Sequence, residues 1–239
     1  MSGSGGAVNV LEEDPDLFRH LPDSQLDQAR RDAVARLLVV ETGQWSAPEE
    51  MPDEAGSLGL LVLEGVLVRS VSLAGREGLE LLGAGDLVRP RLERSGSSNV
   101  TMVVPTVRWW ALTPARLAVL DARFTTRMCG YPEVIGELSR RLERRSSTLA
   151  MRFAIIQQPR LSERLHLLLW HLADRFGRVP ARGMVLSLPL THELLAQLVG
   201  ARRPSVSRAL KELERDEIVL RRPDGSWWLS PRSPEGTAS

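Results

Sequence analysis

Two short helical patterns, separated by a glycine and a proline, constrain the fold of this chain more than any other feature. The segment THELLAQLVG, residues 191–200, begins with a threonine that can cap a helix. It ends with Gly200, which can adopt the left-handed conformation that stops a helix. Pro204 then falls in the first turn of the next pattern, RRPSVSRALKEL, where its missing N–H needs no partner. The sequence therefore predicts two helices joined by the turn GAR.

The second predicted helix, residues 203–215, has an apolar face and a basic face. Val206, Leu210 and Leu213 recur at i, i+4 and i+7, which places them on one side. The opposite side carries serine, arginine and lysine. A helix N-terminus favours phosphate groups, and arginine can donate two hydrogen bonds to the edge of a guanine. This face therefore has the chemistry of a helix that reads DNA in the major groove.

The next segment, EIVLRRPDGSWWLS, contains two strand-like runs around a PDG turn and predicts a hairpin. Arg221 and Arg222 are then placed to contact the sugar–phosphate backbone, as the wing of a winged helix–turn–helix would. The alternative is a pair of helices with a solvated basic face and no nucleic-acid partner. The hairpin and the basic outer face together favour DNA binding.

The totals fit a protein of two small domains that meets a polyanion. The chain has 239 residues, of which 43% are hydrophobic, enough to bury a core in each domain. Its net charge is +1, but acidic segments lie in the first sixty residues and arginines gather from Arg140 onward. No apolar run is long enough to span a bilayer, and the start lacks a signal-peptide pattern. We therefore expect a cytoplasmic protein with no membrane partner.

Catalytic or metal chemistry is not predicted. The single Cys129 excludes an internal disulfide and a CxxC zinc site, and we expect it to be a small buried side chain. HELLA at His192 lacks the second histidine of a zinc-protease helix, and GAGDLV lacks the third glycine of a dinucleotide loop. No spacing pairs a nucleophile with a base. The expected protein is not an enzyme and has no cofactor.

The first half of the chain changes texture several times. Its Gly/Ser-rich start predicts disorder over residues 1–16, and helical spacing predicts a helix from Leu17 into the AVARLL cluster. Short β-branched and aromatic runs within residues 57–111 predict an antiparallel barrel or sandwich. Thr113 and Pro114 in TPARLAVL predict that a helix resumes there.

One long helix is predicted between Pro132 and Pro159, because two prolines bracket a segment without an internal proline. Apolar side chains recur along it at close to heptad spacing. A helix this long usually needs a partner helix, so a dimer seam is favoured over packing within one chain. The expected seam consists of Leu138, Leu142, Leu149, Phe153 and Ile156. A shorter amphipathic helix follows and ends at Gly177.

The segment LTHELLAQLVGARRPSVSRALKELE with its hairpin resembles the winged helix–turn–helix of the Crp/Fnr family of bacterial transcription regulators. HLPDSQL, LVLEGVLVRS, GAGDLV and ELSRRLERRSSTLA also follow the order of that family. The resemblance implies an α+β fold with an N-terminal antiparallel β-barrel of the cyclic-nucleotide-binding type, a double-stranded β-helix. A long dimerisation helix and the winged helix–turn–helix follow. The expected parts are a disordered N-terminus at 1–16, a sensor domain at 17–130, the dimerisation helix at 131–158, the DNA-binding domain at 159–232 and a tail at 233–239.

The resemblance also implies roles for single residues. Arg203 and Arg208 match family positions that reach base edges, and Ser205 matches a hydroxyl that bonds a phosphate. Helical geometry alone adds Arg202, Ser207 and Lys211. The expected DNA-binding set, with the wing, is Arg202, Arg203, Ser205, Ser207, Arg208, Lys211, Arg221 and Arg222.

Two departures from the family pattern bear on function. Pro204 stands where better-known members have a glutamate that accepts a bond from a base, so we expect an unusual operator. In the family, a Gly-Glu pair and an Arg-Ser/Thr-Ala run hold the cyclic nucleotide, but RPRLERSGSS follows GDLV here. Control by cyclic AMP is therefore not expected. A different effector site is a candidate, and its residues would be Arg89, Arg91, Arg94, Arg145 and Ser146.

Together these patterns predict a homodimeric transcription regulator that binds a pseudo-palindromic operator through residues 203–215. Its expected partners are double-stranded DNA and a second copy of the chain. RNA polymerase is a further candidate partner, and the effector is unknown. The alternative is a ligand-sensing or protein-interaction module whose helix–turn–helix does not bind DNA.

Overall fold

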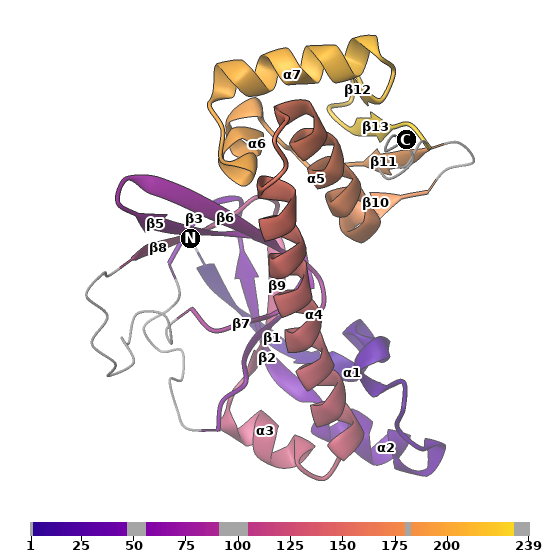
Figure 1. The fold of residues 1–239 in the computed structure, drawn as a ribbon. Coiled ribbons are helices and arrows are strands. Elements are labelled where there is room, and N and C mark those ends of the chain that lie inside the picture. Colours follow the sequence, from indigo (N-terminus) through magenta and orange to yellow (C-terminus); the bar gives the residue numbers. More distant parts are fainter. Residues whose placement is uncertain (1, 47–55, 91–104, 180–182, 232–239) are drawn as a thin grey trace. The chain divides into compact units, whose positions relative to one another are not determined.

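The computed structural model describes residues 2–46, 56–90, 105–179 and 183–231 of the chain. It divides into two compact units, residues 1–76 with 80–147 and residues 77–79 with 148–239. Figure 1 follows the chain from its indigo N-terminal strand to the yellow C-terminal hairpin. The boundary between the units falls within the long helix, so the domain expected at 131–158 is shared between them.

The first unit contains two sheets. The five-stranded sheet has the order β1 (Ser2–Asn9), β2 (Val34–Val40), β9 (Ala115–Leu120), β4 (Gly59–Glu64) and β7 (Leu87–Val88). The four-stranded sheet has the order β3 (Gly43–Trp45), β8 (Thr106–Ala111), β5 (Leu67–Leu73) and β6 (Arg76–Leu82). The pairs on either side of β9 and of β8 are antiparallel. The α+β class with an antiparallel N-terminal domain is confirmed, but among the described residues the predicted barrel is not closed.

The centre of the five-stranded sheet, formed by β4 and β9, is buried on both faces. Leu60 and Val62 of β4 join the core shared with Trp109, whereas Leu61 faces the helices. Such strands are apolar throughout and lose the alternation that marks a half-buried strand. For this reason the helix predicted in TPARLAVL is wrong, because that run is β9. Thr113 caps no helix there, and its Oγ1 accepts a hydrogen bond from the Val66 N–H at 2.9 Å.

Four short helices cover the outer face of that sheet. They are α1 (Val10–Glu13), the 3-10 helix η1 (Pro15–Phe18), α2 (Asp23–Asp32) and α3 (Ala122–Met128). The disorder predicted for residues 1–16 is wrong for the described residues 2–16, because β1 pairs with β2 and Val10 is fully buried. The helix predicted into AVARLL is also wrong, since α2 ends at Asp32 and β2 begins at Val34. Cys129 is exposed rather than buried.

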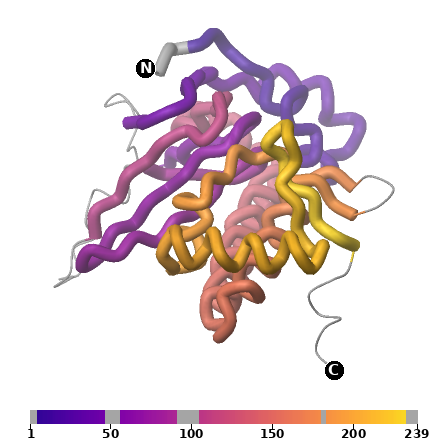
Figure 2. Tube along the Cα trace, turned by 90° about the horizontal axis from the view of Figure 1, so that it is seen from above, coloured from indigo at the N-terminus to yellow at the C-terminus, as the bar shows by residue number. Residues whose placement is uncertain are grey.

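The second unit consists of three helices and a small sheet. It contains α5 (Leu161–Phe176), α6 (His192–Val199) and α7 (Arg203–Arg215). Its antiparallel sheet has the order β10 (Gly177–Arg178), β11 (Met184–Leu186), β13 (Trp227–Leu229) and β12 (Val219–Arg221). Helix α5 packs against both α6 and α7, and α7 also contacts β12. Figure 2 shows α7 in orange-yellow beside the yellow hairpin.

The helix predicted between the two prolines is α4 (Pro132–Ile156). Its apolar residues differ in burial. Leu138 is only 2% exposed and belongs to the core of the first unit, so it must be removed from the expected seam. The other four seam residues stay at the surface, with exposed fractions of 49% for Leu142, 40% for Leu149, 67% for Phe153 and 38% for Ile156.

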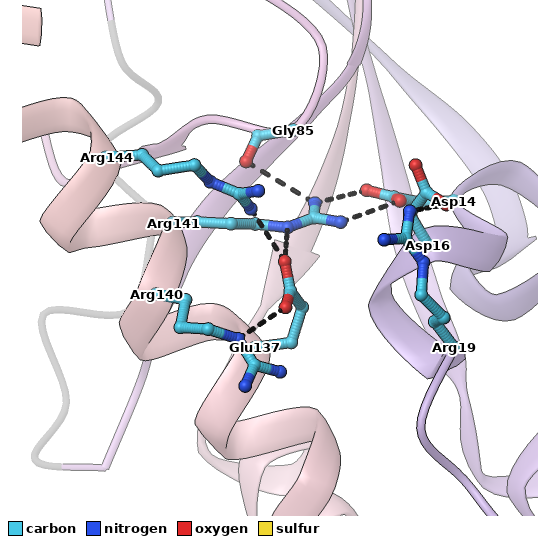
Figure 3. Close-up of polar contacts among 8 residues, drawn as sticks. All are labelled: Asp14, Asp16, Arg19, Gly85, Glu137, Arg140, Arg141 and Arg144. Atoms are coloured by element: carbon cyan, nitrogen blue, oxygen red, sulfur yellow. Dashed lines mark hydrogen bonds and ion pairs between the residues drawn. The ribbon is translucent and has the colours of Figure 1, made fainter.

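Two clusters of ion pairs fasten α4 to the rest of the first unit. In the first, the Arg141 guanidinium donates to both carboxylate oxygens of Asp14 and to the Gly85 carbonyl (Figure 3). Glu137 accepts hydrogen bonds from Arg140 at 2.8 Å and from Arg144 at 2.6 Å. Burial alone would raise the pKa of Glu137, but these two arginines lower it below its ordinary value.

The second cluster joins α4 to the four-stranded sheet through the buried carboxylate of Glu80. Arg145 of α4 donates to its two oxygens at 2.7 and 2.9 Å, and Arg69 of β5 donates at 3.0 Å. Arg145 also donates to the Leu87 carbonyl at 3.1 Å. Burial favours the neutral carboxyl, but the hydrogen bonds and charges of the two arginines outweigh it and lower the pKa of Glu80. The carboxylate is therefore ionised at neutral pH.

This cluster predicts an acid-sensitive part of the stability. Because the folded-state pKa of Glu80 lies below its ordinary value of 4.5, the carboxylate stabilises the fold above that pH. The contribution is lost as the pH falls through the lowered folded-state pKa. We expect Glu80→Gln to reduce the free energy of unfolding by roughly 3 kcal/mol at pH 7, because the half-buried Arg69 and Arg145 lose a carboxylate partner.

Urea unfolding of both proteins between pH 7 and pH 3.5 checks this expectation. The difference between them should shrink below pH 4.5. Glu143→Gln, on an exposed position of α4, is the control and should change little at any pH. A difference that stays constant across the range would show that the ionisation of Glu80 contributes nothing.

Candidate nucleic-acid interface

The turn between α6 and α7 has the geometry that the sequence predicts. Thr191 caps α6, because its Oγ1 accepts a hydrogen bond from the Leu194 N–H at 3.1 Å. Gly200 ends the helix in the left-handed region, with φ of 64° and ψ of 37°. The Ala201 N–H then donates to the Ala196 carbonyl at 2.9 Å, which satisfies a carbonyl of the last turn. Helix α7 therefore starts from a fixed turn.

Helix α7 is anchored by its apolar face. Val206, Leu210 and Leu213 are buried as predicted, together with Ala209, and the helix packs on α5 and α6. Pro204 lies in the first turn, where its missing N–H breaks no helical hydrogen bond. The remaining sides of the helix face solvent.

The exposed side of α7 is basic at its start and acidic at its end. Five members of the predicted DNA-binding set are exposed here, namely Arg202, Arg203, Ser205, Arg208 and Lys211. Within the described part of the chain, their four cationic groups make no hydrogen bond or ion pair with another side chain. Glu212, Glu214 and Asp216 lie at the other end. The net positive charge of the helix is therefore concentrated in its N-terminal half.

The N-terminus of α7 is also open. Among the described residues no side chain caps it, since the N-cap residue is Arg202, whereas Thr191 caps α6. The partial positive charge of the helix end adds to the charge of the neighbouring arginines. Figure 1 shows α7 at the periphery of the second unit. The N-terminus of this helix can therefore accept an anion.

Ser207 occupies a different position from the one that helical geometry suggested. Its side chain is only partly exposed, and its Oγ lies 2.9 Å from Nδ1 of His192. The imidazole of His192 lies against the indole of Trp227, with 6.4 Å between the ring centroids. In the sequence, His192 stands out only because HELLA lacks the second histidine of a zinc-protease helix. The contact joins residues fifteen positions apart in two helices, and no local pattern signals it.

The wing arginines differ from each other as well. The guanidinium of Arg221 lies 4.4 Å from the centroid of the Trp227 ring and donates to the Leu190 carbonyl at 3.1 Å. Arg221 therefore holds the hairpin against the unit. Arg222 is exposed, and its N–H donates to the Ser226 carbonyl at 2.9 Å across the predicted turn. Asp224 fixes that turn by accepting from the Ser226 N–H and hydroxyl, which lower the pKa of the aspartate.

The expected effector residues do not come together in the described structure. Arg91 and Arg94 lie outside the described residues. Arg89 donates to the carbonyls of Leu58 and Ser57, and Arg145 is bound to Glu80. Ser146 is exposed on α4. The two described arginines thus have structural partners rather than a free anion-binding face.

The described residues contain neither a metal-binding cluster nor a membrane-spanning helix. No group of three or more His, Cys, Asp and Glu side chains there is arranged to hold a metal ion. No helix in the same ranges is both long enough and apolar enough to cross a membrane.

Comparison with known proteins also identifies a helix–turn–helix in the second unit. Residues 163–229 match the family model described as a Crp-like helix-turn-helix domain. No curated protein sequence is similar enough to the chain to count as a match.

Several solved structures share the fold of nearly the whole chain. A cyclic nucleotide-binding domain containing protein from Listeria monocytogenes is 16% identical with a TM-score of 0.63, over 90% of this chain and 96% of that one. The c-di-GMP responsive global regulator CLP of Xanthomonas campestris is 18% identical with a TM-score of 0.59, over 88% and 100%. TTHA1359, a transcriptional regulator of the CRP/FNR family from Thermus thermophilus, is 20% identical with a TM-score of 0.58, over 84% and 95%. The second unit thus contains a Crp-like helix-turn-helix domain, and the chain as a whole has the fold of the Crp/Fnr transcription regulators.

Proposed function

We propose that the chain is a homodimeric transcription regulator that binds a pseudo-palindromic DNA operator through α7 and is not controlled by cyclic AMP. The observation that carries this proposal is the start of α7. There, two exposed arginines flank an uncapped helix N-terminus, Arg208 and Lys211 continue the exposed basic side over the next two turns, and the apolar face of the same helix is buried. That arrangement suits a helix that enters the major groove with its first turns against the base edges.

The division of labour on α7 follows from its side chains. Arg203 and Arg208 present planar forks that can donate two hydrogen bonds to N7 and O6 of guanine. Lys211 and the wing residue Arg222 are suited to phosphate contacts, which position the protein without reading sequence. Arg221 is not proposed as a principal DNA contact, because its guanidinium already donates to the Leu190 carbonyl and lies over the Trp227 ring.

A second copy is the proposed partner of α4. Leu142, Leu149, Phe153 and Ile156 recur at spacings of seven, four and three residues, so they form one apolar stripe. Exposed apolar side chains of this size on one helix are typical of an interface. A two-fold dimer would present two α7 helices to two half-sites, which accounts for a pseudo-palindromic operator.

Independence from cyclic AMP is supported by the hydrogen-bond partners of two arginines. A buried phosphate needs an arginine and backbone donors, and the ribose hydroxyl needs a fixed acceptor. Arg145 and Arg89 instead donate to groups of the protein itself. The two described arginines of the candidate effector set therefore bind groups of the protein itself rather than forming an open anion site.

A selection experiment tests the central proposal. Purified protein is incubated with fragments of the genome that encodes it, and the retarded fragments are sequenced. We expect a short, two-fold symmetric sequence to be enriched. If no fragment is retained above a scrambled duplex, the alternative of an interaction module without DNA binding is favoured.

The recovered operator then allows a test of single residues. We expect Arg203→Ala and Arg208→Ala each to weaken operator binding by about 1–3 kcal/mol and to relax the preference at one base pair. Lys211→Ala should weaken all sequences alike, because a phosphate contact carries no sequence information. Arg215→Ala, an exposed arginine at the far end of the same helix, is the control. Operator affinity that survives both of the first two changes would contradict the role of α7.

The dimer is tested on the same surface. Leu149→Glu would place a charge inside the apolar stripe of α4, so we expect monomers in sedimentation velocity at micromolar concentration. Leu73→Glu changes an equally exposed leucine outside α4 and should leave the dimer intact. A wild-type protein that is monomeric under these conditions would rule out the dimer.

Cyclic nucleotides provide a fourth test. We expect titration calorimetry with cyclic AMP or cyclic GMP to give no saturable heat, and operator affinity to be the same with and without either compound. Unsatisfied polar groups on a buried nucleotide would cost about 1–3 kcal/mol each, which is too much for micromolar binding to survive. Micromolar binding together with a tighter operator complex would show that other groups form the pocket.

A further inference from the structure

The start of α6 and the DNA-facing part of α7 are linked by one side-chain hydrogen bond. His192 is the first residue of α6, and its Nδ1 lies 2.9 Å from the Oγ of Ser207, in the second turn of α7. Ser207 shares a helix face with Arg203 and Lys211, which precede and follow it by four residues. The partly exposed hydroxyl is therefore held beside the exposed basic surface described above, on the side of α7 that faces α6.

His192 is itself held from the other side. Its ring lies against Trp227 of β13 at 6.4 Å between centroids, and Arg221 of β12 covers the same indole at 4.4 Å. Arg221 also donates to the Leu190 carbonyl, just before the cap of α6. The wing, the start of α6 and the middle of α7 are thus joined through the sequence of contacts Arg221, Trp227, His192 and Ser207.

The charges around the imidazole favour its neutral form. Burial lowers the pKa of His192, and the positive charges of Arg221 on β12 and Arg203 on α7 lower it further. A neutral imidazole has one donor and one acceptor nitrogen, so it can exchange a hydrogen bond with a hydroxyl in either direction. Ser207 then keeps unused hydrogen-bonding capacity for a group outside the protein.

We infer that His192 is a positioning residue for DNA recognition, which fixes the Ser207 hydroxyl on α7 for contact with a base edge. This inference rests on the proposed DNA-binding function. It assigns His192 a role that is exerted through Ser207, and it makes the wing a support for α7 through Trp227.

A set of four variants tests the inference. His192→Phe keeps a ring against Trp227 but loses the nitrogen, and Ser207→Ala loses the hydroxyl. His192→Asn places a polar atom close to the position of Nδ1 and should restore the bond. The double variant His192→Phe with Ser207→Ala completes a double-mutant cycle.

Affinity is measured by fluorescence anisotropy with the selected operator and with a scrambled duplex, and folding is checked by thermal unfolding. We expect each single change to weaken operator binding roughly five-fold, as for one net hydrogen bond. The double variant should be no weaker than either single one. The Asn variant should bind within about two-fold of wild type, and scrambled DNA should be bound equally by all.

Each result bears on one claim. Wild-type operator affinity in His192→Phe, or additive losses in the double variant, would overturn the positioning role while the proposed function stands. A wild-type protein that selects no DNA sequence would overturn both. Loss of binding to scrambled DNA as well, with a lower unfolding temperature, would show a structural role only and would also reject the inference.

Discussion

The orientation of the exposed basic side chains of α7 depends on the apolar side chains that the helix buries. Val206, Leu210 and Leu213 pack inside the second unit, and burying a side chain of this kind stabilises a fold by about 1.5–3 kcal/mol. A rotation of the helix that exposed these residues would carry Arg208 inward without a partner, and an unpaired buried charge is far more costly than the loss of one contact. The apolar face therefore fixes the basic face, and Gly200 fixes the point from which the helix starts.

The parts of the fold that the sequence predicts correctly are those with local signals. The cap at Thr191, the stop at Gly200 and the prolines around α4 act within one or two helical turns, and the structure has each element where these residues place it. The errors arise where tertiary contacts decide. Strand β9 is apolar apart from Arg116 because both of its faces are covered, and β1 is ordered because β2 supplies its hydrogen-bond partners. Neither fact is visible in a short window of sequence.

In the candidate site, too, the residues with local sequence signals could be predicted and those that depend on tertiary contacts could not. Helical periodicity is enough to find the exposed residues Arg208 and Lys211, and the family resemblance adds Arg203. It was not enough for Ser207, because its partner His192 belongs to another helix, or for Arg221, because the Trp227 ring approaches it from the adjacent strand. In the first unit Arg145 was a candidate ligand residue by its place in the chain. Its carboxylate partner, Glu80, lies 65 positions away and could be found only in three dimensions.

The hydrogen-bonding capacity of α7 limits what the helix can read in its proposed role. Arginine and lysine only donate, and the acidic residues of α7 lie at its far end, while Pro204 offers no polar group where the family has an acceptor. In the major groove guanine presents two acceptors, whereas cytosine presents an amino donor. A helix with donors in its first two turns is therefore equipped to read guanine directly and cytosine only through its paired guanine. The exceptions are the serine hydroxyls, which also accept, and Ser207 is the one whose position is set by a second residue.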